Sequence, residues 1–298
     1  MYSLRRTIHV GFAKLRRTVL WRLRRAFWRL QRYRRRRAFG QTLRLTVDTE
    51  FPESLTLRYP RHSLRQKVVQ YTDYVQLHSL YSFVGSLPSA PTVLELGAHH
   101  GVYATLLGLL LKSKQGRFVA VEPSSVNAEI LRRNIHLNGL EQTVEVEEVF
   151  VLDTDSDVLF KEAGAVSSLG TGEATDIRIR CEPIGSLLRR LALRHIHILI
   201  MDVEGAEVRV LQAFPWQDVT VSRIYCELHP GEWSKFGNAG TELANVLHQR
   251  DLLCLDMYLN RYEVFPDTGY IGPTLMIPRR PTESQGLLAA GLLGDAAP

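Results

Sequence analysis

Cysteine is scarce in this chain of 298 residues, and the three that occur are far apart. Cys181, Cys226 and Cys254 form no C-x-x-C pair, and their number is odd. This pattern argues against both a disulfide framework and a zinc site, and it predicts an intracellular protein.

Long apolar runs are absent as well. No stretch of about 18 consecutive apolar residues occurs, which is the length expected of a helix that crosses a bilayer. The hydrophobic content of 45% is ordinary for a globular protein, so a buried core is expected. Any membrane contact is therefore predicted to be peripheral.

Acidic residues are missing from residues 1–40, which we call the basic arm. Thirteen arginines and Lys14 lie there, so the rest of the chain carries 23 basic against 31 acidic side chains. Apolar residues recur along the arm at steps of three or four, which predicts an amphipathic helix. They are Leu4, Ile8, Phe12, Leu15, Val19, Leu23, Phe27 and Leu30.

The basic arm suits more than one partner. An apolar stripe beside arginines resembles a helix lying in the headgroup region of an anionic membrane, which is the interpretation we favour. Arginines and aromatic residues would also suit RNA, and an acid-free, Arg-rich stretch is typical of transit peptides. A solvated tail without a specific partner is the fourth alternative.

From residue 92 onward, apolar strands alternate with helices. Strands are expected at TVLELG, GRFVAVE, TVEVEEVFV (143–151), HIHILIMD and VSRIYCEL, and near 252–259 and 272–277. Helices are expected over 101–114, 124–140, 206–214 and 238–250, with another over 64–86. Strands that are apolar on both faces predict the α/β class, with a doubly wound, mostly parallel sheet.

Carboxylates and glycines follow the strands, and in a parallel sheet the carboxyl ends meet at one edge, where ligands bind. The E-x-G-x-x-x-G spacing of the first loop departs from the G-x-G-x-x-G of dinucleotide sites. Glu122, 21 residues after Gly101, is placed to accept the ribose hydroxyls of an adenosine-bearing ligand. The edge residues are Glu95, Gly97, Gly101, Glu122, Glu147, Glu148 or Asp153, Asp202, Glu204, Glu227 and His229.

An ordered set of motifs resembles the FkbM-type S-adenosylmethionine-dependent methyltransferases. The motifs are ELGAHHG (95–101), AVEPS (120–124), RNIHLN (133–138), SSL (167–169) and MDVEGAE (201–207). The resemblance spans about residues 92–230 and implies a Rossmann-like, class I methyltransferase domain over 92–278. Before it lie the basic arm and an extension of short strands and a helix over 41–91. Residues 279–298 are predicted to be a disordered tail.

S-adenosylmethionine is the cofactor that this resemblance implies. Glu95 would face the amino group of its methionine moiety, the glycine loop would line that moiety, and Glu122 would bind the ribose. Tight packing between strand and helix is the alternative reason for the glycines. The cofactor-binding residues implied by the resemblance are Glu95, Gly97, Ala98, His99, Gly101, Glu122 and Asp202.

Methylation of a hydroxyl also needs a base. His229, with Asp202 or Glu204 nearby, is the candidate, because imidazole titrates near neutral pH. His99 and His100 are its rivals in the cofactor loop. These assignments make His229, Asp202 and Glu204 the predicted catalytic residues.

Two further interpretations concern the same edge. Glu207, in the first turn of a helix, is interpreted as a helix-end charge. Asp202, Glu204, Glu227 and His229 could supply metal ligands, but no dense spacing such as H-x-x-x-H occurs, so no metal is predicted.

The sequence therefore predicts O-methylation of a hydroxyl on a small molecule or saccharide. The enzyme is expected to be cytoplasmic, with the basic arm on an anionic membrane surface. An RNA methyltransferase is an alternative that the acidic rim disfavours. Ile200 and Gly185 replace a Lys and an Asp that are common in the family, which keeps a degenerate interaction module open.

Overall fold

A computed structural model describes residues 42–46, 54–58, 71–161, 168–169, 177–257 and 259–279. The chain divides into two compact units, Met1–Leu43 and Arg44–Pro298. The basic arm and the tail beyond residue 279 lie outside the described residues, so their helix and their disorder stay predictions. Among the described helices, none combines the length and the apolar character needed to cross a bilayer.

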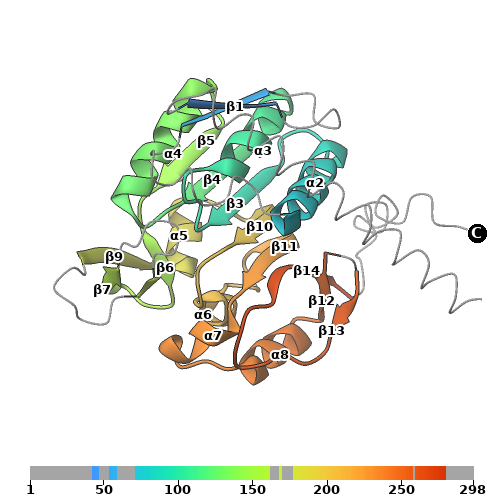
Figure 1. Cartoon of the computed structure of the whole chain (residues 1–298). Coiled ribbons are helices and arrows are strands. Elements are labelled where there is room, and N and C mark those ends of the chain that lie inside the picture. The colour runs from blue at the N-terminus through green and yellow to red at the C-terminus, as the bar shows by residue number, and fades with distance from the viewer. Residues whose placement is uncertain are drawn as a thin grey trace, which may run out of the picture. The chain divides into compact units, whose positions relative to one another are not determined.

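The larger unit is built on an eight-stranded sheet with the order β13-β12-β14-β11-β10-β3-β4-β5 (Figure 1). Strands β11, β10, β3, β4 and β5 run parallel, whereas β14, β12 and β13 pair antiparallel. The mostly parallel sheet predicted from the sequence is confirmed. The strands are β3 (Thr92–Leu96), β4 (Arg117–Val121), β5 (Val144–Glu147), β10 (His195–Met201), β11 (Thr220–Leu228), β12 (Leu252–Asp256), β13 (Arg261–Tyr262) and β14 (Gly272–Pro278).

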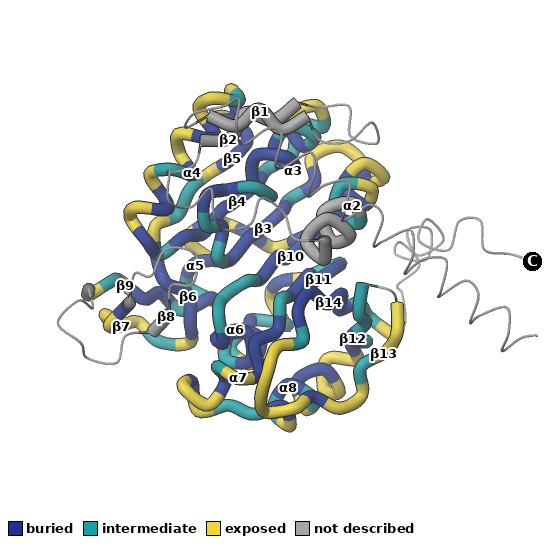
Figure 2. Tube along the Cα trace, viewed as in Figure 1, coloured by how far each residue is buried: buried dark blue, intermediate teal, exposed yellow. Residues whose placement is uncertain are grey.

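Helices cover both faces of this sheet, because successive side chains of a strand point to opposite faces. On β4, Phe118 and Ala120 belong to the core cluster that includes residues of α2, α3 and α4, whereas Val119 and Val121 belong to the one that includes residues of α5, α6, α7 and α8. The helices are α2 (Tyr71–Ser86), α3 (Val102–Ser113), α4 (Ser125–Leu137), α5 (Ile184–Arg190), α6 (Glu207–Ala213), α7 (Pro230–Trp233), the 3-10 helix η2 (Ser234–Phe236) and α8 (Gly240–Gln249). Figure 2 shows the buried residues concentrated along the central strands.

The single strand predicted over 143–151 is wrong. It divides into β5 and β6 (Phe150–Leu152), which belong to different sheets. Pairing with β4 ends at Glu147, and Val149 and Phe150 then join the core on the α5 face. Periodicity could not show this break, because apolar residues continue on both sides of it.

β6 belongs to a four-stranded sheet with the order β6-β9-β7-β8. Its other strands are β7 (Ser156–Lys161), β8 (Ser168–Leu169) and β9 (Ile177–Pro183). β6 pairs parallel with β9, and β7 pairs antiparallel with both β8 and β9. A further two-stranded sheet consists of β1 (Thr42–Thr46) and β2 (Ser54–Arg58).

Candidate active site

The loop after β3 needs its two glycines for packing. Gly97 has φ 87°, and a Cβ there would lie 1.8 Å from the carbonyl oxygen of Asp202. Gly101 has φ 81° and begins α3, where a Cβ would lie 2.2 Å from Cδ1 of Leu131. Because packing alone explains both glycines, the contacts with the methionine moiety stay a prediction.

Neighbouring elements hold this loop in place. The backbone N–H groups of Gly97 and Ala98 both donate to the carbonyl oxygen of Val121, each at 2.9 Å. Asn134 Nδ2 donates to the carbonyl oxygen of His100 at 2.7 Å, which gives the RNIHLN motif a structural role. Between these anchors His99 adopts φ 49°, a left-handed conformation that non-glycine residues rarely take outside constrained turns.

Glu122 lies immediately after β4, where the sequence places it. Its carboxylate is buried and accepts three hydrogen bonds, from the N–H groups of His99 (2.7 Å) and Ser124 (3.0 Å) and from Asn127 Nδ2 (3.2 Å). Ser124 also caps α4 by accepting from the N–H of Asn127. Glu122 thus connects the β3 and β4 loops and is rigidly positioned.

Glu95, on β3, is the residue that most clearly lacks a partner. Its side chain is buried, with 2% of the residue exposed, and its Oε2 has no hydrogen-bond partner. Burial raises the pKa of Glu95 well above its ordinary value, and the Asp202 and Glu122 carboxylates add to the shift. A buried carboxylate without a donor is costly, so this position favours a cationic ligand.

The ammonium and sulfonium groups of S-adenosylmethionine fit this requirement. His99 adds a second polar atom in the same loop, because its Nε2 is buried without a partner. Burial lowers the pKa of His99 to about 4, so the ring is neutral at physiological pH. It stacks on His100 with 3.8 Å between ring centroids.

Four groups meet beyond the ends of β10 and β11, and we call Asp202, Glu204, Glu227 and His229 the His229 cluster. From Nε2 of His229, Oε2 of Glu204 lies at 3.5 Å, Oε1 of Glu227 at 3.7 Å and Oδ1 of Asp202 at 3.8 Å. These distances exceed ordinary hydrogen-bond lengths. The structure therefore brings the three predicted catalytic residues together, with Glu227 beside them.

The other ring nitrogen of His229 is firmly held by Glu207. Nδ1 donates to Oε1 of Glu207 at 2.9 Å, and the same carboxylate accepts from the N–H of Gly205 and from Nε1 of Trp233. Glu207 does lie in the first turn of α6, as the sequence predicts, but it has no exposed surface and its carboxylate also holds His229 and Trp233. Two of its partners lie 22 and 26 residues away in sequence, which is why local spacing could not show this role.

The ionisable groups of the His229 cluster shift one another's pKa values. Burial by itself lowers the pKa of His229, but the hydrogen bond to Glu207 and the surrounding carboxylates outweigh it and raise the pKa to about 9. Burial and the neighbouring Glu227 raise the pKa of Asp202 well above its ordinary value. Although 43% of the Asp202 side chain is exposed, its Oδ1 is buried without a partner.

Glu204 combines a raised pKa with an unusual backbone. Burial is the main cause of the raised pKa, and the Glu227 and Glu207 carboxylates add to it against the opposing effect of His229. Its φ is 48°, in the left-handed region, as for His99 in the other loop. Both loops at this edge thus contain a non-glycine residue in a strained conformation.

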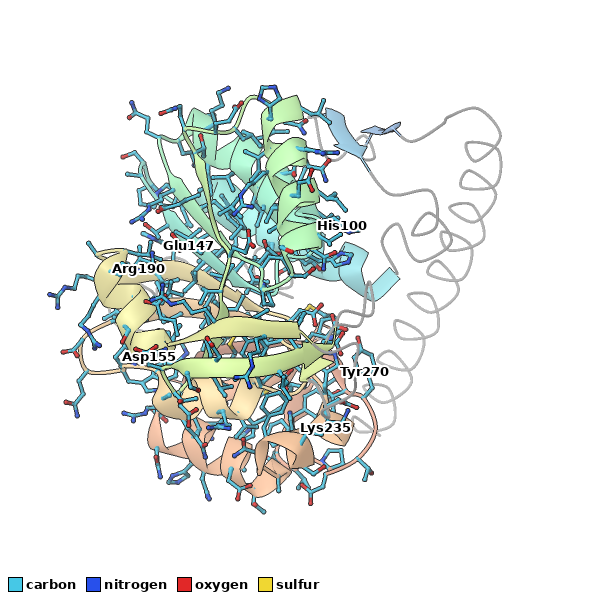
Figure 3. All side chains as sticks on the ribbon, turned by 90° about the vertical axis from the view of Figure 1, so that its left-hand side faces the viewer. His100, Glu147, Asp155, Arg190, Lys235 and Tyr270 are labelled. Carbon is cyan, nitrogen blue, oxygen red and sulfur yellow. The ribbon has the colours of Figure 1, made fainter. Side chains whose placement is uncertain are left out.

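Tyr270, just before β14, is a site residue that the sequence did not single out. Its hydroxyl donates to Oε1 of Glu227, and its ring centroid lies 5.4 Å from that of His229. The residue is 59% exposed and lies at the surface of the molecule (Figure 3). The loop that contains Tyr270 has no catalytic motif in the sequence. Its position beside Glu227 follows from the pairing of β14 with β11.

The remaining predicted edge carboxylates are paired with arginines. Glu147 contacts Arg190 at 2.8 Å, and Glu148 contacts Arg132 at 2.9 Å. Glu147 and Arg190 are labelled in Figure 3. Asp153 contacts Arg209 through two hydrogen bonds. The structure thus separates these three from Glu95 and the His229 cluster.

Comparison with known proteins gives one family and several similar folds. The methyltransferase FkbM domain matches residues 95–254. An O-methyltransferase from Bacillus cereus in complex with SAH is 17% identical, over 74% of this chain and 84% of that chain, with a TM-score of 0.43. None of the curated proteins matches the chain.

Two other similar structures are a SAM-dependent methyltransferase from Agrobacterium tumefaciens and the N-terminal domain of human METTL16. The first is 11% identical over 82% of this chain and 72% of that chain, with a TM-score of 0.46. The second is 12% identical over 76% of this chain and 75% of that chain, with a TM-score of 0.43.

Proposed function

The chain belongs to the FkbM methyltransferase family and is an S-adenosylmethionine-dependent methyltransferase, and we propose that it methylates a hydroxyl oxygen of a saccharide or another small acceptor. The observation that supports this proposal is the position of the His229 cluster. Carboxylates that can accept a proton stand around His229 at the same sheet edge as Glu95, which favours a cation. A hydroxyl needs such a proton acceptor when its oxygen is methylated.

The cofactor side of the site is assigned to the loops after β3 and β4. S-adenosylmethionine supplies, when bound, a methyl group on a sulfonium, whose carbon–sulfur bond breaks as the new carbon–oxygen bond forms. Glu95 binds the ammonium of the methionine moiety, because this gives its buried carboxylate the partner that it lacks. Glu122, held by three N–H donors, binds the ribose.

The acceptor side is assigned to the His229 cluster. The acceptor hydroxyl binds there, and the proton that it loses passes to the carboxylate of Asp202 or Glu204, because His229, with a pKa raised to about 9, already carries its proton at neutral pH. Glu207 keeps the imidazole oriented through its 2.9 Å hydrogen bond. Because methyl transfer needs an in-line approach of the oxygen, a rigidly held cluster contributes mainly by positioning.

A small or saccharide acceptor agrees better with this rim than RNA does. Asp202, Glu204, Glu207 and Glu227 surround a single histidine, and such a concentration of negative charge repels a phosphate backbone. We further propose that the enzyme is cytoplasmic and that the basic arm holds it on an anionic membrane surface, because apolar residues and arginines alternate around its predicted helix.

Calorimetric titration with S-adenosylmethionine tests the cofactor side. The Glu95→Gln variant should weaken binding by about 10- to 100-fold, the range expected for one hydrogen bond between charged groups. Glu129→Gln on α4 is the matched control, because its carboxylate is exposed and its ion pair among the described residues is with Arg133. Equal affinity in the wild type and Glu95→Gln would contradict the assignment.

Labelled methyl transfer tests the acceptor. The full chain would be given methyl-labelled S-adenosylmethionine with a panel of hydroxylated saccharides, simple amines and structured RNA. We expect label in a saccharide ether that survives alkaline treatment. Label only in RNA or only in an amine would overturn O-methylation of a small acceptor.

Vesicle sedimentation tests the membrane proposal. Full-length protein should bind anionic vesicles and not zwitterionic ones, and salt should weaken the binding. Replacing Arg34, Arg35, Arg36 and Arg37 with Gln should reduce it. Binding that is unchanged by these substitutions and by salt would show that the basic arm is not the anchor.

A further inference from the structure

We propose that Asp202, Glu227 and His229 form a binding site for a divalent cation of the Mg²⁺ or Mn²⁺ kind. This differs from the expectation that no metal is bound, which relied on spacing along the sequence. The three ligands come from the ends of β10 and β11, which lie side by side in the sheet although 25 residues separate Asp202 from Glu227. The site rests on geometry alone, and only its role in catalysis rests on the proposed function.

The spacing of the ligand atoms suits a shared ion. One oxygen from each carboxylate and a ring nitrogen of His229 all lie within 4.8 Å of one another. From Nε2, the oxygens of Glu227 and Asp202 are 3.7 and 3.8 Å away, too far for a hydrogen bond. Two ligands each about 2.1 Å from one ion can be up to about 4.2 Å apart, so small side-chain rotations complete the site.

Two of the three ligand groups lack a hydrogen-bond partner at the atom that would bind. Only 10% of the His229 side chain is exposed, and the shortest distance from its Nε2 to a carboxylate oxygen of the cluster is 3.5 Å, to Oε2 of Glu204, longer than an ordinary hydrogen bond. Asp202 Oδ1 is buried and also without a partner. The two atoms lie 3.8 Å apart, so one cation bound between them would satisfy both.

Supporting hydrogen bonds already orient two of the ligands. Nδ1–H of His229 donates to Glu207, which leaves the lone pair of Nε2 available in the neutral ring. The Tyr270 hydroxyl donates to Glu227 and holds that carboxylate. A histidine that donates one N–H to a buried carboxylate is the usual arrangement for a metal ligand, and here it is present at a group of carboxylates.

The charge balance also calls for a cation. Within the part of the chain that the structure describes, no Lys or Arg pairs with Asp202, Glu204, Glu207 or Glu227. His229, whose pKa these carboxylates raise, is the basic group among them. Once it gives up its Nε2 proton to a bound ion, two carboxylates and a neutral imidazole would balance a divalent charge. A set of mainly oxygen donors with one imidazole favours Mg²⁺ or Mn²⁺ over the metals that thiolates select.

An ion in this position has room for an acceptor oxygen. Three protein ligands leave open coordination positions on an ion that takes six. The acceptor's hydroxyl can occupy one of them, which makes its proton easier to lose. Glu204 is outside the ligand set, 3.5 Å from Nε2, and is the carboxylate that takes this proton.

Titration with Mn²⁺, followed by electron paramagnetic resonance, tests the site on the full-length protein without cofactor or acceptor. We expect one saturable site per chain. Asp202→Asn and Glu227→Gln should each raise the dissociation constant by at least about 100-fold, beyond the 10- to 100-fold typical of lost supporting contacts. The matched control for the first is Asp218→Asn, an exposed aspartate after α6, which should bind as the wild type does.

The half-exposed Asp202 is the safer variant if Glu227→Gln folds poorly, and thermal unfolding of each variant checks this. A wild type without a saturable site, or Asp202→Asn with unchanged Mn²⁺ affinity, would overturn the inference. Glu207→Gln tests the hydrogen bond that orients His229. It should weaken Mn²⁺ binding by about 10- to 100-fold, although Glu207 is not itself a ligand.

Methyl transfer with and without a chelator separates this inference from the proposed function. Loss of transfer in chelator and its recovery with Mn²⁺ would support both. Transfer that continues at full rate in chelator would overturn the catalytic role of the ion and leave O-methylation standing. Asp202-dependent Mn²⁺ binding with transfer to amines alone would support the metal site and overturn O-methylation.

Discussion

The carboxylates near the ends of the strands fall into two groups, which differ in whether an arginine contacts them. Beyond β5 and β6, the carboxylates of Glu147, Glu148 and Asp153 each contact an arginine. Beyond β3, β10 and β11, Glu95 and the His229 cluster contact no Lys or Arg among the described residues. Acidic residues near the ends of strands thus form one group that arginines neutralise and another in which His229 is the basic partner.

The difference indicates which of these carboxylates belong to the structure of the fold and which to its function. Exposed ion pairs such as Arg132–Glu148 add little to stability, because water screens them. Buried carboxylates without cations destabilise the fold, and a chain that retains them needs a compensating benefit. For Glu95 we propose that this benefit is a cationic cofactor, and for the His229 cluster an acceptor hydroxyl and a divalent ion.

Removing the Glu207 side chain should lower the free energy of unfolding most. No arginine among the described residues pairs with this carboxylate, but it accepts hydrogen bonds from three groups. Glu207→Ala leaves His229, Trp233 and the N–H of Gly205 without their acceptor. We expect a loss of about 3–5 kcal/mol in the free energy of unfolding, measured with urea. A loss as small as that of Glu232→Ala, at a partly exposed carboxylate on α7, would contradict the structural role of Glu207.

Replacing Glu95 with Gln should instead increase the stability of the protein. Glu95→Gln removes an unsatisfied buried charge, so we expect the protein without cofactor to gain about 1–3 kcal/mol in stability near neutral pH. The pKa of Glu95 is raised in the folded protein, so its ionisation opposes folding: stability is complete below the ordinary Glu range and falls as pH rises through the raised pKa. The gain should therefore be larger at about pH 8 than at about pH 5 in thermal unfolding.

Cofactor binding should release a proton, because a cation next to Glu95 favours the ionised form. Calorimetry of S-adenosylmethionine binding in two buffers with different heats of ionisation would reveal it. The apparent enthalpy should depend on the buffer for the wild type and much less for Glu95→Gln. An equal buffer dependence in both proteins would mean that another group supplies the proton.

Substitutions among the arginine-paired carboxylates and their arginines should change stability and cofactor affinity least. Arg190 contacts both Glu147 and Glu182, but 42% of its side chain is exposed. Arg190→Ala should therefore cost about 1 kcal/mol or less in chemical unfolding and should leave cofactor affinity unchanged. A tenfold loss of affinity would show that the two groups of carboxylates are coupled, which would remove the distinction between them.

Part of the site could be predicted from the sequence because it depends on neighbours in the chain. Apolar strands alternating with helices predict the parallel sheet, and a residue that directly follows a strand is placed by that strand alone. This applies to Glu122 and Asp202 and to the glycine loop after β3, and Glu95 is placed in the same way by its position near the end of β3. The predicted strand over 143–151 failed because apolar residues continue past the point where the chain changes sheet.

By itself, then, the sequence determined the fold class, the family and the edge at which the polar groups gather. Only the tertiary structure decided which carboxylates meet an arginine, that Glu207 turns inward to His229, and that Tyr270 reaches Glu227. The physical reason is the range of the interactions. Strand and helix patterns follow from side chains a few residues apart, whereas charge compensation depends on packed groups that are distant along the chain.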